Sequence, residues 1–306
     1  MTSIPEDDPE LESVAQHLLG LDPDGSRIAA ALRNTIDMLL DGQHTGRFRW
    51  DQLHKTEKTH CGTLVEINLQ RAFEFHGGTD LDYEIAGVDV DCKFSQDLWK
   101  WMIPPEAVGK LCFVVWANDE ASRWCAGLVR TSASVLGGGA NRDLKRTLSQ
   151  EGRKKVRRLF WNAPLQENTL LKLAPADVKA IFASKSGQQR LDELFRRAQG
   201  RRISRTVIAT VAQQDDYMKR IRYNGGSRSR LQPEGIVIFG QFSSHQAAAA
   251  ALGLPVPQAG ESVSARLALY RAELHGSAPR TVLEGAEWVL AGPTDLPERA
   301  PVLPQT

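Results

Sequence analysis

The chain has 306 residues, of which 42% are hydrophobic and 25% charged, and its formal net charge is +1. This length accommodates two domains of ordinary size, and the composition is typical of an average globular protein. No apolar run approaches the 18 residues of a membrane span. The acidic N-terminus is unlike a secretion signal. The four scattered cysteines predict reduced thiols, so we expect a cytoplasmic protein.

Basic residues are concentrated in two segments. Residues 142–158 contain eight basic and two acidic side chains, a net charge of +6, and Lys185–Arg230 contains twelve and four, a net charge of +8. Such segments are typical of a protein that binds a polyanion, such as a nucleic acid, on particular faces of its surface. Solvated helix faces are an equally good explanation of the charge alone.

The first half of the chain predicts helices followed by a sheet. Residues 1–24 are acidic and contain proline, which predicts a loose N-terminal arm. Helical spacing of apolar residues predicts one helix that ends at Asp41-Gly42 and a second over 63–75. Alternation of apolar and charged residues over 81–94 then predicts a β-hairpin.

Two further strands complete the predicted first domain. The apolar run 111–116 indicates a fully buried strand, and 124–129 indicates its neighbour. We therefore expect an α/β (α+β) domain with a mixed sheet over residues 25–160, with the basic stretch 142–158 leading into a linker at 161–168.

The second half predicts a mainly α-helical, winged helix-turn-helix domain over 169–292, followed by an extended proline-rich tail over 293–306. Its predicted helices span 175–184, 188–198, 203–211 and 213–222. Two short segments, 229–231 and 236–239, are separated by Pro233-Glu234-Gly235 and predict the strands of a wing.

The hairpin places charged residues opposite one another. If Ala86-Gly87 is the turn, Asp82 faces Asp91 across the two strands. Like charges at such positions are destabilising unless a cation bridges them, and oxygen-only ligands suit Mg²⁺. Lys93 lies two residues beyond Asp91 and points to the same face.

This combination fits the chemistry of phosphodiester hydrolysis. Metal ions neutralise charge on the phosphate and acidify water, and a lysine can orient the water or stabilise the transition state. We interpret Glu66, Asp82, Asp91 and Lys93 as catalytic, with the three carboxylates as metal ligands. Two alternatives remain: the charged face is merely solvated, or Glu66 forms a capping box with Thr63 at a helix start.

The predicted helix 213–222 is the candidate recognition helix. Arginine and glutamine can read base edges in the major groove, whereas lysine more often contacts phosphate. The candidate DNA-binding residues, on this helix and at the wing, are Gln214, Lys219, Arg220, Arg222, Arg228 and Arg230. An amphipathic helix that packs a core is the alternative, and both roles can hold at once.

Asp82, followed after a hairpin by Asp91-Cys92-Lys93 and preceded by Glu66 on a helix, resembles the PD-(D/E)xK nuclease motif, with Leu81 in place of its proline. A wider set of segments resembles the NaeI family of restriction endonucleases, in order from about residue 20 to 260. These segments are 51–60 (DQLHKTEKTH), 62–69 (GTLVEINL), 82–87 (DYEIAG), 90–94 (VDCKF), 140–146 (ANRDLKR), 207–216 (VIATVAQQDD) and 233–236 (PEGI).

The resemblance implies a Mg²⁺-dependent type II restriction endonuclease of the two-site (IIE) kind. Such an enzyme is a homodimer that cuts one duplex while a catabolite-activator-like domain holds a second duplex as effector. The family's metal and catalytic residues map onto Glu66, Asp82, Asp91 and Lys93. The alternatives are a nuclease for junctions or mismatches and a DNA-binding regulator with a degenerate nuclease domain, against which the intact carboxylates and lysine argue.

Overall fold

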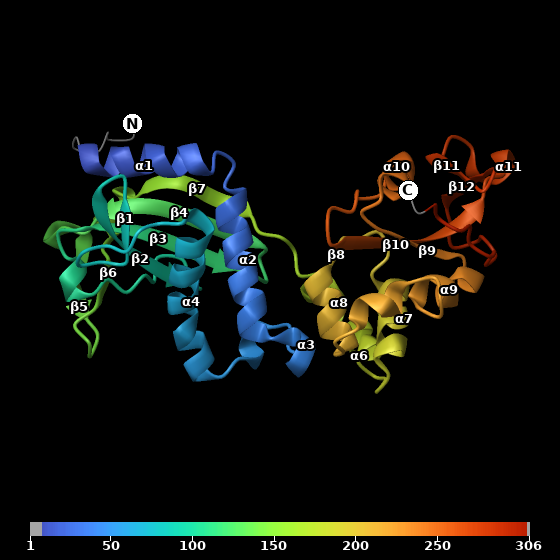
Figure 1. Cartoon of the computed structure of the whole chain (residues 1–306), viewed down its shortest axis with the longest axis horizontal. Helices are drawn as coiled ribbons and strands as arrows, with labels where there is room; N and C mark the ends of the chain where they lie inside the picture. The colour runs from blue at the N-terminus through green and yellow to red at the C-terminus, as the bar shows by residue number, and fades with distance from the viewer. Residues whose placement is uncertain (1–7, 305–306) are drawn as a thin grey trace. The chain divides into compact units, whose positions relative to one another are not determined.

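The computed structural model describes residues 8–304 (Figure 1). The chain divides into two compact units. The first comprises the chain up to Leu39 and Leu53–Glu167, and the second comprises Leu40–Gln52 and the chain from Asn168 onward. No helix in the described part of the chain is both long enough and apolar enough to cross a membrane.

A five-stranded mixed sheet forms the centre of the first unit, as the sequence predicts. In spatial order its strands are β1 (Tyr83–Ile85), β2 (Val88–Ser95), β3 (Leu111–Asn118), β4 (Arg123–Arg130) and β7 (Arg157–Pro164). The β2–β3 pair is parallel and the other pairs are antiparallel. The apolar run in β3 is buried almost throughout, because a central strand is covered on both faces.

Helices cover this sheet (Figure 1). They are α1 (Pro9–Leu21), α2 (Ser26–Leu40) and α4 (Lys55–Phe73). The unit also contains the short helix α5 (Gln150–Lys154) and 3-10 turns at Pro105–Ala107 (η2) and Ala133–Val135 (η3). The helix α1 packs on β4 and β7, whereas α4 packs on β2.

The expected loose arm is wrong for residues 9–21, which form α1. The Asp8 carboxylate caps this helix by accepting a hydrogen bond from Leu11 N at 3.0 Å, and α1 buries Leu11, Val14, Ala15 and Leu18. Asp8, Glu10 and Glu12 pair with basic residues of the sheet, as in the 2.8 Å contact between Asp8 and Arg130. Residues 1–7 lie outside the described part of the chain.

The expected link between the domains is also wrong in part. The basic stretch 142–158 contains the strand β6 (Arg146–Leu148), the helix α5 and the start of β7. Residues 161–164 of the expected linker belong to β7. The strand β6 pairs antiparallel with β5 (Leu136–Ala140) to form a separate hairpin.

The second unit combines helices with a sheet, so the expected mainly α-helical domain is only partly correct. Its helices are α3 (Gly42–Thr45), α6 (Pro175–Ile181), α7 (Gly187–Arg197), α8 (Arg205–Ala212), α9 (Ser227–Leu231), α10 (Ser243–Ala251) and α11 (Ala272–His275), with 3-10 turns at Trp50–Gln52 (η1), Thr169–Lys172 (η4), Tyr217–Ile221 (η5) and Gln232–Glu234 (η6). Its strands are β8 (Ile203–Ser204), β9 (Ile236–Phe239), β10 (Glu261–Leu269), β11 (Arg280–Leu283) and β12 (Ala286–Leu290). The strand β10 pairs antiparallel with β8, β9 and β12.

The predicted recognition helix at 213–222 is wrong. The helix α8 ends at Ala212, because Gln213 adopts a left-handed conformation with φ +51° and its N–H bonds back to Ala209 O. Only the five-residue turn η5 follows. The segment 229–231 belongs to the helix α9 and is not a wing strand. The segment 236–239 is the strand β9, as predicted, but its partner is β10.

The proline-rich end of the chain has no regular secondary structure over 291–304, as expected for an extended tail. It is nevertheless packed: Ala300 and Leu303 are buried in a cluster with Trp288, and Gln232 Nε2 donates to Ala300 O at 2.9 Å.

Candidate active site and nucleic-acid interface

The β1–β2 hairpin has the register that the sequence predicts. Ala86 and Gly87, with φ +52° and +75°, form the tight turn that two-residue hairpins favour. Ile85 therefore pairs with Val88, and Glu84 pairs with Asp89. Asp82 lies just before the paired region.

The Asp82 and Asp91 carboxylates both lie beside the ammonium group of Lys93. Asp82 Oδ2 accepts a hydrogen bond from Cys92 N at 2.7 Å, which holds this carboxylate beside β2. Lys93 Nζ lies 2.7 Å from Asp91 Oδ1 and 3.5 Å from Asp82 Oδ2, and it donates to Cys92 O at 2.9 Å. Three oxygen atoms from two carboxylates and a carbonyl thus surround a single ammonium group.

Asp91 is buried, with 3% of its surface exposed. Besides Lys93, its partner is Cys112, whose Sγ donates to Asp91 Oδ2 at 3.3 Å. Burial raises the pKa of Asp91, although the charge of Lys93 opposes this shift. Burial acts to lower the pKa of Lys93, but the charge and hydrogen bond of Asp91 outweigh it and raise that pKa. The lysine is therefore held in its charged form.

Glu66 lies in the middle of α4, so the capping explanation is wrong. The helix begins at Lys55, and His54 N donates to Glu57 Oε2 at 2.7 Å, which places the N-terminal cap three turns before Glu66. Burial raises the pKa of Glu66, and the charge of Asp82 raises it further. The Tyr83 hydroxyl donates to Glu66 O at 2.7 Å and ties the hairpin to α4. The structure thus brings all four sequence-predicted catalytic residues to one region.

The oxygen atoms in this region suit a hard divalent cation. Within residues 8–304, no three His, Cys, Asp or Glu side chains converge closely enough to hold an ion by themselves. Mg²⁺ does not require such a set, since it keeps several waters and takes one or two carboxylates. Two carboxylates and a carbonyl around one positive charge fit that preference.

The predicted DNA-binding residues are divided between two environments. Lys219 and Arg222 are exposed on and after η5. Arg222 and Arg228 line a cleft of about 620 Å³ together with Arg205, which the sequence analysis missed. Arg205 is the first residue of α8, and an arginine directly after the Ser204 cap was the available signal. Gln214 and Arg220 are half-buried, and the nearest acidic partner of Arg220 is Asp216, at 3.5 Å.

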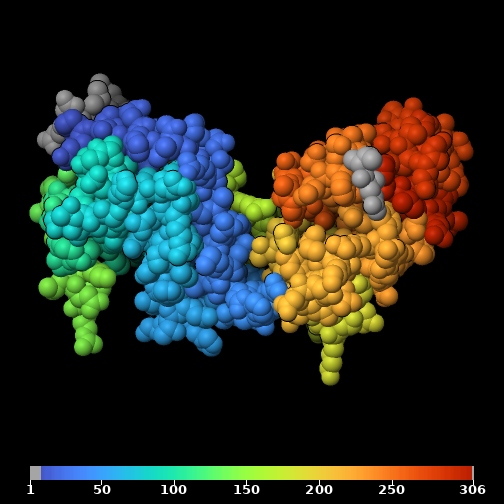
Figure 2. Space-filling model, in the orientation of Figure 1, coloured from blue at the N-terminus to red at the C-terminus, as the bar shows by residue number. Residues whose placement is uncertain are grey.

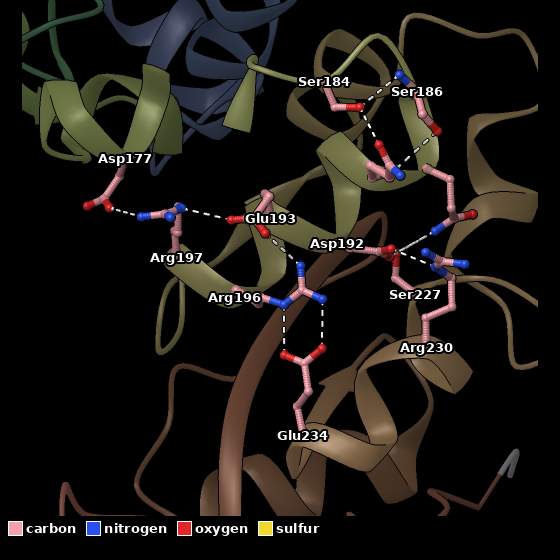
Figure 3. Close-up of polar contacts among 12 residues, drawn as sticks. Asp177, Ser184, Ser186, Asp192, Glu193, Arg196, Arg197, Ser227, Arg230 and Glu234 are labelled. Atoms are coloured by element: carbon pink, nitrogen blue, oxygen red, sulfur yellow. Dashed lines mark hydrogen bonds and ion pairs between the residues drawn. The ribbon is translucent and has the colours of Figure 1, made fainter. Parts of the chain in front are cut away.

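Arg230 is held by an ion pair within the unit (Figure 3). Its Nε lies 2.6 Å from Oδ2 of the buried Asp192 on α7. Oδ1 of the same carboxylate accepts from the Ser227 hydroxyl at 2.8 Å and from Gln188 Nε2 at 3.0 Å. Further along α7, Arg196 forms a bidentate ion pair with Glu234. The helix α7 thereby fixes the position of α9 and η6.

Arg228 is less accessible than the sequence suggested. Its Nε donates to Ile238 O at 3.1 Å, and burial lowers its pKa. The side chain therefore spans from α9 to β9 while its guanidinium borders the cleft.

Comparison with known proteins defines the class of protein. A sequence model described as restriction endonuclease NaeI matches residues 12–298, so the protein is a type II restriction endonuclease, an enzyme that cleaves DNA at specific sequences. The chain belongs to the NaeI family. It is 52% identical over 317 aligned residues to the Type II restriction enzyme NaeI of Lentzea aerocolonigenes, and the alignment covers all of this chain and 99% of that relative. The resemblance expected from the sequence is confirmed.

Proposed function

We propose that the enzyme cuts both strands of a specific duplex by Mg²⁺-dependent phosphodiester hydrolysis in its first unit. One observation carries this proposal: Asp91, Asp82 and the Cys92 carbonyl surround the Lys93 ammonium at 2.7, 3.5 and 2.9 Å. These are the ligand types of Mg²⁺ and the lysine of a phosphate-cleaving site in one place.

The same residues divide the work of hydrolysis. Asp82, Asp91 and the Cys92 carbonyl would hold Mg²⁺, with Glu66 as a further carboxylate, and the ion would neutralise phosphate charge and acidify a water. Lys93 orients that water and donates hydrogen bonds to the phosphate oxygens. Its fixed charge stabilises the negative charge that develops as the water oxygen bonds to phosphorus and the bond from phosphorus to the sugar oxygen breaks.

The second unit is proposed to bind an effector duplex as a winged helix. Its longer elements follow the order helix, strand, helix, helix, strand, helix, strand (α7, β8, α8, α9, β9, α10, β10), and both β8 and β9 pair with β10. In this arrangement the DNA-contacting region moves from 213–222 to 217–231, which contains Lys219, Arg220, Arg222, Arg228 and Arg230. The wing becomes the connection between β9 and β10, which includes the helix α10.

Cleavage of plasmid DNA tests the proposal for the first unit. Purified protein with Mg²⁺ should give discrete fragments, and chelation of the metal should stop the reaction. Nicking only at extruded junctions would favour the structure-specific nuclease instead, and absence of cleavage would contradict the proposal. Sequencing the fragment ends identifies the site.

A one-site plasmid tests the effector role and the homodimer. An effector can accelerate cleavage only by favouring the cutting-competent state, so a one-site plasmid should be cut slowly and an added duplex with the site should speed the reaction. Equal rates with and without that duplex would exclude the two-site arrangement. Sedimentation should give twice the 33.8 kDa chain mass, and a monomer mass would contradict the homodimer.

A further inference from the structure

The β5–β6 hairpin projects from the first unit, as the light-green protrusion in Figure 2 shows. Its base is firmly anchored: Leu136 and Leu148 lie in one buried cluster with Cys112. The Cys112 thiol in turn contacts Asp91 at 3.3 Å. The base of the hairpin therefore packs in the same core that contacts the proposed catalytic carboxylate of Asp91.

Three consecutive glycines, Gly137–Gly139, occupy the strand β5. None of the three is among the glycines with positive φ. A Cβ atom at Gly138 or Gly139 would meet no atom within 4 Å, and one at Gly137 would touch only Thr147 O, at 3.4 Å. The pairing of β5 with β6 shifts register between Leu136 and Ala140, but neither a positive φ nor internal packing requires glycine at these three positions, where glycine costs about 0.5–1 kcal/mol relative to alanine. A glycine in a strand often marks a bulge or the close approach of another backbone, and a single bulge does not need three glycines.

The tip of the hairpin has a defined shape and a positive charge. Asn141 Oδ1 accepts hydrogen bonds from Asp143 N at 3.0 Å and Lys145 N at 2.8 Å, which closes the loop. Leu144 is 67% exposed there. Three basic residues and one acidic residue over 141–146 give the tip a net charge of +2. The tip thus combines one exposed apolar side chain with basic neighbours.

We propose that this hairpin enters the major groove of the duplex being cut. The backbone at Gly138 and Gly139 lies against the sugar–phosphate chain, Arg142 and Lys145 contact phosphates, and Leu144 touches base edges. The major groove admits a two-stranded β-ribbon, and phosphate contacts set the register of a protein on DNA. This inference rests on the proposed function of the first unit. It adds an element that recognises the DNA sequence at which the enzyme cuts.

Crosslinking tests which DNA the tip touches. The four native cysteines are buried, so a thiol-directed aryl azide would label a Leu144→Cys variant selectively. Gln16→Cys, at an exposed position of α1, is the matched control. Each labelled protein is irradiated without metal in the presence of a duplex carrying the site mapped by end sequencing, and Mg²⁺ is then added.

The Leu144→Cys protein should crosslink and then cut the attached duplex, whereas the Gln16→Cys protein should not crosslink. No crosslink at position 144 would overturn the inference. So would an attached duplex that stays whole while free duplex is cut, because the tip would then touch a different DNA. If the unlabelled wild-type enzyme with Mg²⁺ leaves free duplex uncut, the proposed function fails instead.

Valine substitution tests the glycine face independently. Valine favours strands, so Gly138→Val and Gly139→Val should not lower the unfolding temperature, yet each should slow cleavage at least tenfold by keeping the DNA backbone away. Gly20→Val on α1, where an added Cβ also meets nothing within 4 Å, should cut at the wild-type rate. Wild-type cleavage by both hairpin variants would contradict the inference.

Discussion

At the scale of single residues, the hairpin uses its acidic side chains for different purposes. Asp91 is buried against Lys93. Asp89, in contrast, accepts hydrogen bonds from the backbone of Thr79 and Asp80 at 2.9 and 3.0 Å, which is a structural role. Glu84, directly opposite Asp89, is exposed. Only one part of the alternating charged face therefore belongs to the proposed catalytic site.

This difference predicts the outcome of substitutions in the hairpin. Asp91→Ala and Lys93→Ala should each reduce cleavage by several orders of magnitude, at about 1.4 kcal/mol of activation free energy per tenfold, while DNA binding is retained. Asp82→Asn should behave similarly, and Glu66→Gln more mildly. Glu84→Gln is the matched control and should cut normally. Single-turnover kinetics and a filter-binding assay measure both properties, and near-normal cleavage by a stable Asp91→Ala or Lys93→Ala variant would refute the assignment.

His245 makes the second unit sensitive to acid. Gly240 N donates to its Nδ1 at 3.0 Å, so Nε2 carries the hydrogen and donates to Pro304 O at 2.7 Å. Burial, with a smaller contribution from the positive charge of Arg228, lowers the pKa of His245 from 6.5 to about 4. Between these values the unfolded chain binds a proton that the folded protein rejects, so stability is complete above pH 6.5 and falls as the pH drops toward 4.

We therefore expect the free energy of unfolding to fall by up to about 1.4 kcal/mol per pH unit across this window because of His245. Urea midpoints at pH 7.5, 6.0 and 5.0 measure the effect. A His245→Gln variant should show a flatter dependence. If it loses as much stability on acidification as the wild type, another group is responsible.

At the scale of elements, α7 decides the position of the basic helix α9. Asp192, 2% exposed, accepts hydrogen bonds from Ser227 and Arg230 of α9. A buried carboxylate requires such partners, since an unsatisfied one costs several times the value of an ordinary hydrogen bond. Arg230 therefore stabilises the fold whether or not it also contacts DNA.

This role predicts that Arg230→Ala lowers the free energy of unfolding by about 1–3 kcal/mol. Adding Asp192→Asn should restore part of the loss, because a neutral amide is cheaper to bury. Arg222→Ala, at an exposed position, should weaken DNA binding without changing the urea midpoint. Equal midpoints for Arg230→Ala and the wild type would show that the ion pair contributes nothing to stability.

At the scale of the whole molecule, the second unit is built from two separate stretches of the chain. Leu40–Gln52 belongs to the second unit although it precedes most of the first. Phe48 stacks on Phe182 with ring centroids 5.7 Å apart, and Asn168 Nδ2 donates to Phe48 O at 3.1 Å. A Cβ atom at Gly42 would lie 2.1 Å from Thr210 Oγ1, so only glycine permits this close approach to α8.

A fragment that starts at residue 165 should therefore be less stable than the second unit is in the intact protein. A synthetic peptide of residues 40–52 should raise its melting temperature, because the peptide restores the Phe48 contacts and binds only the folded state. The same peptide with Phe48→Ala is the control and should have a smaller effect. A fragment that melts at the same temperature with and without the peptide would contradict this account.

The sequence by itself determined the β1–β2 hairpin and its acidic site. A two-residue turn with a left-handed backbone fixes the register of both strands, and the strand period then fixes the face of each side chain. The closeness of Asp82, Asp91 and Lys93 could therefore be predicted from the local sequence, and the apolar run of β3 indicated a central strand in the same way.

The tertiary structure alone decided the features that depend on distant partners. Acidic residues 8–12 suggested a loose arm, but their partners Arg130 and Arg157 lie more than 110 positions further along the chain. The helical pattern of 213–222 was overridden by the left-handed Gln213, which ends α8. The place of Leu40–Gln52 depends on Phe182 and Thr210, which no local pattern connects to it. The local sequence determines the turns and the face of each strand to which a side chain points. The helix α1, the end of α8 and the place of Leu40–Gln52 depend instead on burial and ion pairs that form only in the folded chain.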